Sequence, residues 1–177
     1  PKILDAEVLR FQNNKERWIA FVGLYKNKPY EIFTGKAEDF IVPQWVNNGQ
    51  ITRKEKSKKD ERAQYDFSFT DKQGYEVIQP GLSRSFEKEY WNYAKLISGI
   101  LRHGMPLPFV VELVSNLDLH DETINTWKNG VVRAIKKFIP DGTEVPEKQC
   151  PECGAKNALI YKEGCLMCPD CGYSKCG

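Results

Sequence analysis

The alternation of hydrophobic and polar positions predicts β-structure in the first half of the chain. Residues 18–34 are rich in β-branched and aromatic side chains and are interrupted by a polar turn at 26–28, a pattern typical of a hairpin. Residues 65–78 alternate in the same way around a turn at 71–74, which predicts a second hairpin. Residues 40–46 are expected to add a short strand or a turn.

Helical spacing replaces this alternation in the second half. Ser85 is expected to cap a first helix that ends at Gly104, and Pro106 and Pro108 to open a short second helix. A third helix is expected from Asp121 onward. Strands followed by a run of helices indicate an α+β fold, here two β-hairpins and about three helices before a C-terminal zinc ribbon.

A polar stretch at 143–149 is typical of a linker. We therefore expect an α+β domain over residues 1–145 and a cysteine-rich tail over residues 146–177. No apolar run reaches the ~18 residues of a membrane span, and the first residues do not form a signal peptide. Because the sequence also lacks an initiator Met, we expect a C-terminal piece of a longer, cytoplasmic chain.

The charge balance gives little sign of a nucleic-acid partner. The 177 residues carry a formal net charge of only +2, with 41% hydrophobic residues. The basic residues within 53–62 are interspersed with acids, which favours a solvated hairpin tip over a phosphate-binding patch. His103 and His120 have no evident partner, so we expect structural or exposed histidines rather than catalytic ones.

All six cysteines lie at or after Cys150. A disulfide framework would staple the whole domain, whereas cysteines of a reducing cytosol are more often metal ligands or reactive thiols. Two matched Cys-Pro-x-Cys-Gly motifs bring two thiolates each toward one ion at about 2.3 Å. They predict a zinc ribbon whose small hairpin turns at Glu163-Gly164. The expected ligands are Cys150, Cys153, Cys168 and Cys171.

Four ligands complete a structural zinc site, so Cys165 and Cys176 are left over. Two spare thiols near a mobile chain end can carry reducing equivalents, and the cationic Lys175 favours the thiolate of Cys176. A rival partition stays open, in which the metal is bound by Cys150, Cys153, Cys165 and Cys168. In that case Cys171 and Cys176 form the redox pair.

The cysteine-rich ending resembles the C-terminus of adenosylcobalamin-dependent (class II) ribonucleotide reductases, in the form found in Bacteroidetes-like bacteria. The resemblance covers nearly the whole chain. The stretches that carry it are residues 10–23, 29–35, 90–99, 101–106, 124–130 and 163–177.

The resemblance implies an oxidoreductase that makes deoxyribonucleotides for DNA replication, named here as a ribonucleoside-diphosphate reductase. The sequence leaves open whether the substrate is a diphosphate or a triphosphate. Its cobalamin cofactor and thiyl radical belong to a ten-stranded catalytic barrel expected before Pro1. Tail cysteines would reduce the active-site disulfide of that barrel and be regenerated by a thioredoxin-like dithiol reductant. In this scheme Cys176 attacks, Cys165 resolves, and the linker at 143–149 supplies reach. A homo-oligomer is also conceivable.

Two other functions remain open at this point. A nucleic-acid-binding zinc ribbon would need a basic stripe with stacking aromatics, and none is visible in the sequence. A purely structural assembly module would use the α+β domain for subunit contacts. Both functions can coexist with the redox role.

Overall fold

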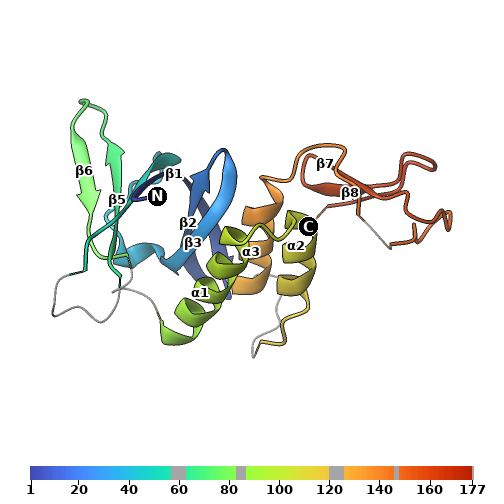
Figure 1. Cartoon of the computed structure of the whole chain (residues 1–177), viewed down its shortest axis with the longest axis horizontal. Coiled ribbons are helices and arrows are strands. Elements are labelled where there is room, and N and C mark those ends of the chain that lie inside the picture. Colours follow the sequence, from blue (N-terminus) through green and yellow to red (C-terminus); the bar gives the residue numbers. More distant parts are fainter. Residues whose placement is uncertain (57–62, 83–86, 120–125, 146–147, 177) are drawn as a thin grey trace.

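The computed structural model describes residues 1–56, 63–82, 87–119, 126–145 and 148–176. It is an α+β structure with a large sheet at one end, a small cysteine-rich sheet at the other, and helices between them (Figure 1). This confirms the predicted fold class. The elements, in chain order, are β1 Ile3–Asn13, β2 Glu16–Tyr25, β3 Lys28–Lys36, the 3-10 helix η1 Ala37–Asp39, β4 Asn48–Arg53, β5 Tyr65–Thr70, β6 Glu76–Gln79, α1 Lys88–Arg102, α2 Leu107–Ser115, α3 Trp127–Lys136, β7 Ile160–Lys162, β8 Cys165–Met167 and β9 Ser174–Lys175.

The large sheet is antiparallel throughout, in the order β3-β2-β1-β4-β5-β6. Both predicted hairpins are present, as β2–β3 and β5–β6. The turn before β3 places Lys26 and Asn27 at positive φ, and Gly74 in the turn before β6 has φ +90°. These are conformations that Gly and Asn tolerate better than other residues.

Two further strands, β1 and β4, join the hairpins into one sheet. β1 pairs with β2 along most of its length, with Val8 opposite Phe21, and its other edge pairs with β4. The short strand considered at 40–46 is absent. After η1 the chain turns instead, and the Val46 N–H donates to the Pro43 carbonyl at 3.0 Å. A proline without an N–H favours such a turn over a strand.

Both faces of the central strands are buried, so the sheet separates two hydrophobic clusters. One cluster, called here the aromatic core, lies on the face where β4–β6 and η1 pack; the other, called here the helical core, lies under the helices. Successive residues of β2 alternate between the two. The buried members of the aromatic core are Ala6, Val8, Ile19, Phe21, Phe33, Phe40, Val46, Ile51, Tyr65, Phe67, Phe69 and Leu82.

The helices are tied to the sheet by buried polar contacts. The Ser98 hydroxyl of α1 accepts the Ile32 N–H at 3.0 Å and donates to the Ile32 carbonyl at 3.2 Å, so it caps an edge position of β3. The first helix ends as expected, with Gly104 at φ +76°. Its expected cap, Ser85, lies outside the described residues.

The third helix starts at Trp127, where the Thr126 side chain accepts the Asn129 N–H at 3.3 Å and caps the first turn. The expected start, Asp121, lies outside the described residues. The N–H of Trp127 donates to Asn13 Oδ1 at 3.1 Å, and its indole donates to Thr34 Oγ1 at 2.8 Å. These contacts anchor α3 to the β1–β2 turn and to β3.

Candidate metal and redox centre

The two Cys-Pro-x-Cys-Gly motifs fold into matching turns. The Gly154 N–H donates to the Cys150 carbonyl at 3.0 Å, and the Gly172 N–H donates to the Cys168 carbonyl at 2.8 Å. The glycines have φ +74° and +79°, a backbone conformation that a side chain would strain. Each motif therefore turns its two thiols toward the same side. The strands β7, β8 and β9 form the three-stranded sheet between and after the motifs.

The four cysteines of these motifs converge on one point. Their sulfur atoms all lie within 4.8 Å of one another, with Cys150 Sγ 3.7 Å from Cys171 Sγ and Cys153 Sγ 3.7 Å from Cys168 Sγ. A tetrahedral zinc site with bonds of about 2.3 Å has sulfur–sulfur edges of about 3.8 Å. The donor set and its spacing therefore fit a tetrahedral Cys₄ metal site.

The electrostatics of this cluster also favour a bound cation. The backbone N–H of Cys153 is the largest contribution that lowers the pKa of Cys150, to about 7. The backbone N–H of Tyr173 favours the Cys171 thiolate too, but burial and the neighbouring thiols outweigh it and raise the pKa of Cys171 to about 12. The neighbouring thiols thus oppose the ionisation of Cys171, and a divalent cation bound by the cluster would remove that opposition.

The remaining two cysteines form a disulfide, Cys165–Cys176. Cys165 begins β8 and is half-buried, whereas Cys176 follows β9 and is exposed. The structure thus separates four clustered thiols from one bonded pair, as in the first of the two partitions. It does not bring Cys165 into the cluster or pair Cys171 with Cys176. The chemical roles of both sets stay predictions.

The cysteine-containing segment, residues 150–176, is called here the cysteine module and packs against the helices. Cys150, Cys168, Leu159 and Tyr161 are buried in the helical core, together with residues of α2 and α3. The other buried members of that core are Phe11, Trp18, Ala20, Val22, Ile32, Ala94, Ile97, Leu101, Val110, Val111, Val114, Trp127, Val131, Val132, Ala134, Ile135, Ile139 and Val145.

The first part of the expected linker is not free chain. The Tyr161 N–H donates to the Thr143 carbonyl at 2.9 Å, and the Val145 N–H donates to the Leu159 carbonyl at 3.0 Å. Val145 is also buried in the helical core. Residues 143–145 therefore act as an extra edge of the module, which corrects the expectation of a reach-giving linker there; residues 146–147 lie outside the described residues.

A cavity of about 460 Å³ adjoins the disulfide. It lies between the C-terminal end of α3 and the β7–β8 turn. Cations from α3 and the two cysteines of the disulfide both line this cavity. Its charged or sulfur-bearing lining residues are Arg133, Lys136, Lys137, Asp141, Glu163, Cys165 and Cys176.

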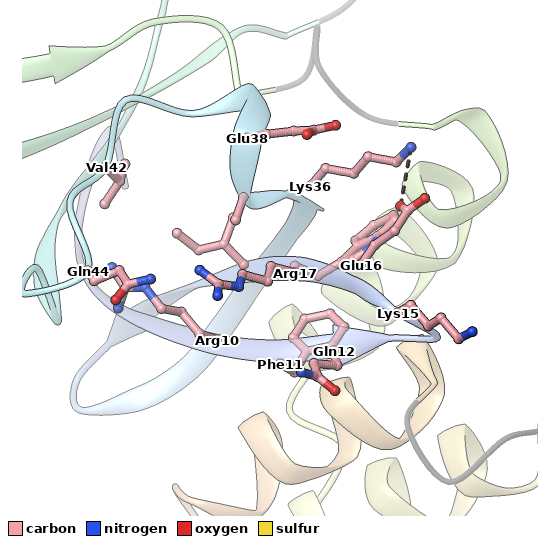
Figure 2. Close-up of a pocket in the computed structure, with 13 residues that line it drawn as sticks. Arg10, Phe11, Gln12, Lys15, Glu16, Arg17, Lys36, Glu38, Val42 and Gln44 are labelled. Carbon is pink, nitrogen blue, oxygen red and sulfur yellow. Dashed lines mark ion pairs between the residues drawn. The ribbon is translucent and has the colours of Figure 1, made fainter.

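Another cavity, of about 870 Å³, has no cysteine in its lining. Figure 2 shows its lining side chains, which come from the β1–β2 hairpin, the end of β3 and the segment that follows. Arg10 donates to the Pro43 carbonyl at 2.7 Å, and burial lowers the pKa of Arg10. Lys36 pairs with Glu16 at 3.3 Å and with Glu87 at 3.4 Å. Because two of its cations already have protein partners, we assign this cavity no ligand.

The other residues considered from sequence do not join the centre. His103 follows the last turn of α1, away from the cysteines, and His120 lies outside the described residues. Residues 57–62 of the basic stretch also lie outside them. Among the described residues, no helix is long and apolar enough to cross a lipid bilayer.

The fold and the centre together define a class: an α+β domain carrying four clustered cysteines that are placed to bind a metal ion, and a separate disulfide. The chain belongs to the family of NrdJ homologue C-terminal domains, whose family model matches residues 4–140. NrdJ is the adenosylcobalamin-dependent ribonucleotide reductase, so the match confirms the resemblance and indicates part of such an enzyme. The matched residues end before Cys150. No curated protein and no solved structure matches the chain.

Proposed function

We propose that this chain is the C-terminal, electron-relaying part of an adenosylcobalamin-dependent ribonucleotide reductase. The observation that carries the proposal is the disulfide Cys165–Cys176, formed beside four other cysteines that cluster separately. A structural metal site uses every one of its thiols as a ligand. Two further cysteines, bonded to each other and open to solvent on the Cys176 side, have the properties of a thiol–disulfide exchange pair.

In its reduced form the pair acts on a disulfide of the catalytic barrel, which we expect N-terminal to this region. The Cys176 thiolate attacks one sulfur of that disulfide and forms a mixed disulfide, releasing the other sulfur as a thiolate. The Cys165 thiolate then attacks Cys176 Sγ and releases the second barrel thiolate. The barrel gains two electrons and two protons, and the Cys165–Cys176 bond forms. Cys176 is the attacking residue because it is the exposed member of the pair.

The metal supports this chemistry without taking part in it. A zinc ion held by Cys150, Cys153, Cys168 and Cys171 would supply structural cross-linking and keep those four thiols out of exchange reactions. Cys165 lies in β8, three residues before the ligand Cys168, so its position is fixed by the ligand set. Cobalamin, radical formation and nucleotide binding are assigned to the barrel, and no residue of this chain is given a role in them.

The docked module changes how the relay would reach its target. The hydrogen bonds of residues 143–145 and the burial of Cys150 and Cys168 fix the module to the helices. The disulfide is therefore presented on a rigid body rather than on a swinging tail. On this proposal, approach to the barrel requires movement of the whole domain or the arrival of a segment of the barrel.

The test uses the complete enzyme with Cys165→Ser, Cys176→Ser and the double variant. We expect one turnover from pre-reduced enzyme to survive, because the barrel cysteines are intact. Repeated turnover with a dithiol protein reductant should be lost, and dithiothreitol, which can reach the barrel directly, should restore it in part. Ser174→Ala in β9 is the matched control. Undiminished repeated turnover of the double variant with the protein reductant would refute the relay.

A further inference from the structure

The disulfide lies in a charged cleft rather than on an open surface. The cavity of about 460 Å³ beside it is lined by Arg133 and Lys136 of α3 as well as by Cys165 and Cys176. Helix α3 is anchored to the sheet through Trp127, so these cations are held by a rigid element. Any molecule that reacts with the disulfide from this side meets the α3 cations as it arrives.

The cleft carries charges of both signs. Lys137 pairs with Glu7 at 2.6 Å, which offsets its charge within the protein, whereas Asp141 Oδ1 accepts the Glu163 N–H at 2.7 Å and keeps its negative charge. Arg133 is exposed, and Lys136 is half-buried.

Further ammonium groups reinforce the positive side. Burial is the main cause that lowers the pKa of Lys136, and the charges of Lys175 and Lys148 lower it further. These ammonium groups are therefore close enough to repel one another. Lys175 also directly precedes Cys176 in the sequence. Within the lining the cations are Arg133, Lys136 and Lys137 and the acids are Asp141 and Glu163, and Lys175 adds a positive charge near Lys136.

We propose that this cleft selects the reductant of the relay: a dithiol protein that carries carboxylates beside its reactive cysteine. The proposal rests on the relay function above and names the charge of its partner. Arg133 and Lys136 are recognition residues, which attract the acidic rim of the partner and bring its thiolate to the exposed Cys176 Sγ.

The exchange is balanced without any further reactant. The partner's thiolate attacks Cys176 Sγ, the Cys165–Cys176 bond breaks, and Cys165 leaves as a thiolate that takes a proton from water. The partner's second thiolate then attacks its own sulfur in the mixed disulfide and releases Cys176. The partner becomes a disulfide, while Cys165 and Cys176 gain two electrons and two protons.

Small thiols of different charge isolate the electrostatic part of this recognition. The zinc-loaded protein with its disulfide formed is treated with 2-mercaptoethanesulfonate, 2-mercaptoethanol or cysteamine, which are anionic, neutral and cationic. Loss of the Cys165–Cys176 cross-link is followed by mass spectrometry after acid quench, and each rate is expressed per thiolate. At low ionic strength we expect the anionic-to-cationic rate ratio to exceed one by roughly threefold or more.

Charge variants and salt then test the cause of the ratio. Arg133→Glu, at an exposed position that is tolerant of substitution, should bring the ratio toward or below one, and Lys136→Gln should lower it. Molar salt should lower it in the unchanged protein, which requires no variant to fold. Lys72→Gln, in the β5–β6 turn at the far end of the molecule, is the matched control and should leave the ratio unchanged (Figure 1).

The outcomes separate this proposal from the relay itself. A ratio of one or less in the unchanged protein at low salt overturns the recognition proposal, and so does a ratio that Arg133→Glu and salt leave unchanged. In both cases the disulfide still exchanges and the relay stands. A cross-link that none of the three thiols reduces would instead overturn the relay, and the recognition proposal with it.

Discussion

The large sheet and the cysteine module are stabilised in opposite ways. The sheet buries large aromatic side chains between β1–β3 and β4–β6, where Phe21 and Phe67 are 0% exposed and their rings lie 4.8 Å apart. The strands of the module are three residues or fewer, and two of its four clustered cysteines, Cys153 and Cys171, are exposed. Such a short segment buries too little apolar surface to fold on that basis alone, so cross-links must supply the difference.

The two are nevertheless coupled through the helices. The buried cysteines Cys150 and Cys168 pack in the helical core. The same core contains the β2 side chains that face the helices. The aromatic core lies on the opposite face of the sheet and contains no sulfur. This arrangement predicts that disruption of the four-cysteine cluster destabilises α2 and α3 as well as the module, and leaves the large sheet folded.

The largest effect is expected from loss of the metal. Structural zinc in small domains contributes about 10 kcal/mol or more to folding, so chelation or Cys168→Ser should unfold the module. Hydrogen exchange should show lost protection in β7–β9, a smaller loss in α2 and α3, and little change in β5 and β6. Asp170→Asn, in the same turn but without a ligand sulfur, is the control. Uniform loss of protection over the whole chain would contradict the separation of the two regions.

The converse change is Phe67→Ala in the aromatic core. Removing this fully buried ring should lower the free energy of unfolding by about 3–5 kcal/mol, because it leaves a cavity as well as losing apolar burial. Urea denaturation measures the loss, and zinc content should stay at one ion per chain in the folded protein. Tyr75→Ala, at a position 72% exposed, should cost less than about 0.5 kcal/mol. Zinc release by Phe67→Ala at temperatures where the helices stay folded would contradict the separate stabilisation of the large sheet and the cysteine module.

The sequence predicted those elements whose turn residues and hydrophobic pattern lie within one continuous stretch. Both hairpins carry their turn residues and alternation within one stretch, and the two Cys-Pro-x-Cys-Gly turns carry their own glycines, so each could be inferred without the rest of the chain. β4 could not, because it contains Asn48, Gly49 and Gln50 and only one fully buried side chain, Ile51. Its pairing with β1 and β5 makes it a strand, and no local pattern encodes that pairing.

The same distinction explains the site. The clustering of four sulfurs follows from spacing, whereas the docking of the module depends on contacts between Val145, Leu159 and the helices. Residues 143–149 are polar in sequence and gave no sign of that burial. The N-terminus of α3 depends on distant contacts in a related way, since it is fixed by the Thr126 cap and by the distant Asn13. The α3 cations beside the disulfide are likewise remote from the cysteines in sequence.

A smaller effect is expected where α3 meets the sheet. A methyl group added at Gly130 would collide with the ring of Phe11, so Gly130→Ala should destabilise the chain by about 1–3 kcal/mol. Gly99→Ala in α1 is the matched control, since a methyl group there meets nothing within 4 Å and should be neutral or stabilising by up to about 1 kcal/mol. Thermal unfolding of the two variants compares them directly. Equal effects would mean that the α3–sheet contact is loose.

The smallest effect concerns Glu31 of β3, which is buried under α1. Burial raises the pKa of Glu31, and the hydrogen bond from Arg102 Nη2 at 2.9 Å opposes the shift without cancelling it. Burial is the largest single influence on Arg102 and lowers its pKa, but the hydrogen bond and charge of Glu31 together with Tyr65 outweigh burial, so the pKa of Arg102 is raised. The charged form of Arg102 is therefore favoured, whereas burial still disfavours the charged form of Glu31.

The sign of the pH dependence follows from this shift. Because the folded state holds the Glu31 proton more tightly than the unfolded chain, its contribution to stability is greatest below the unfolded pKa of about 4.3. It declines as pH rises through the folded pKa and is constant above it. Urea denaturation over a pH series should show that decline in the unchanged protein and not in Glu31→Gln. Arg102→Gln removes the opposing bond and should widen the window over which stability falls. A decline that persists in Glu31→Gln would assign it to another carboxyl group.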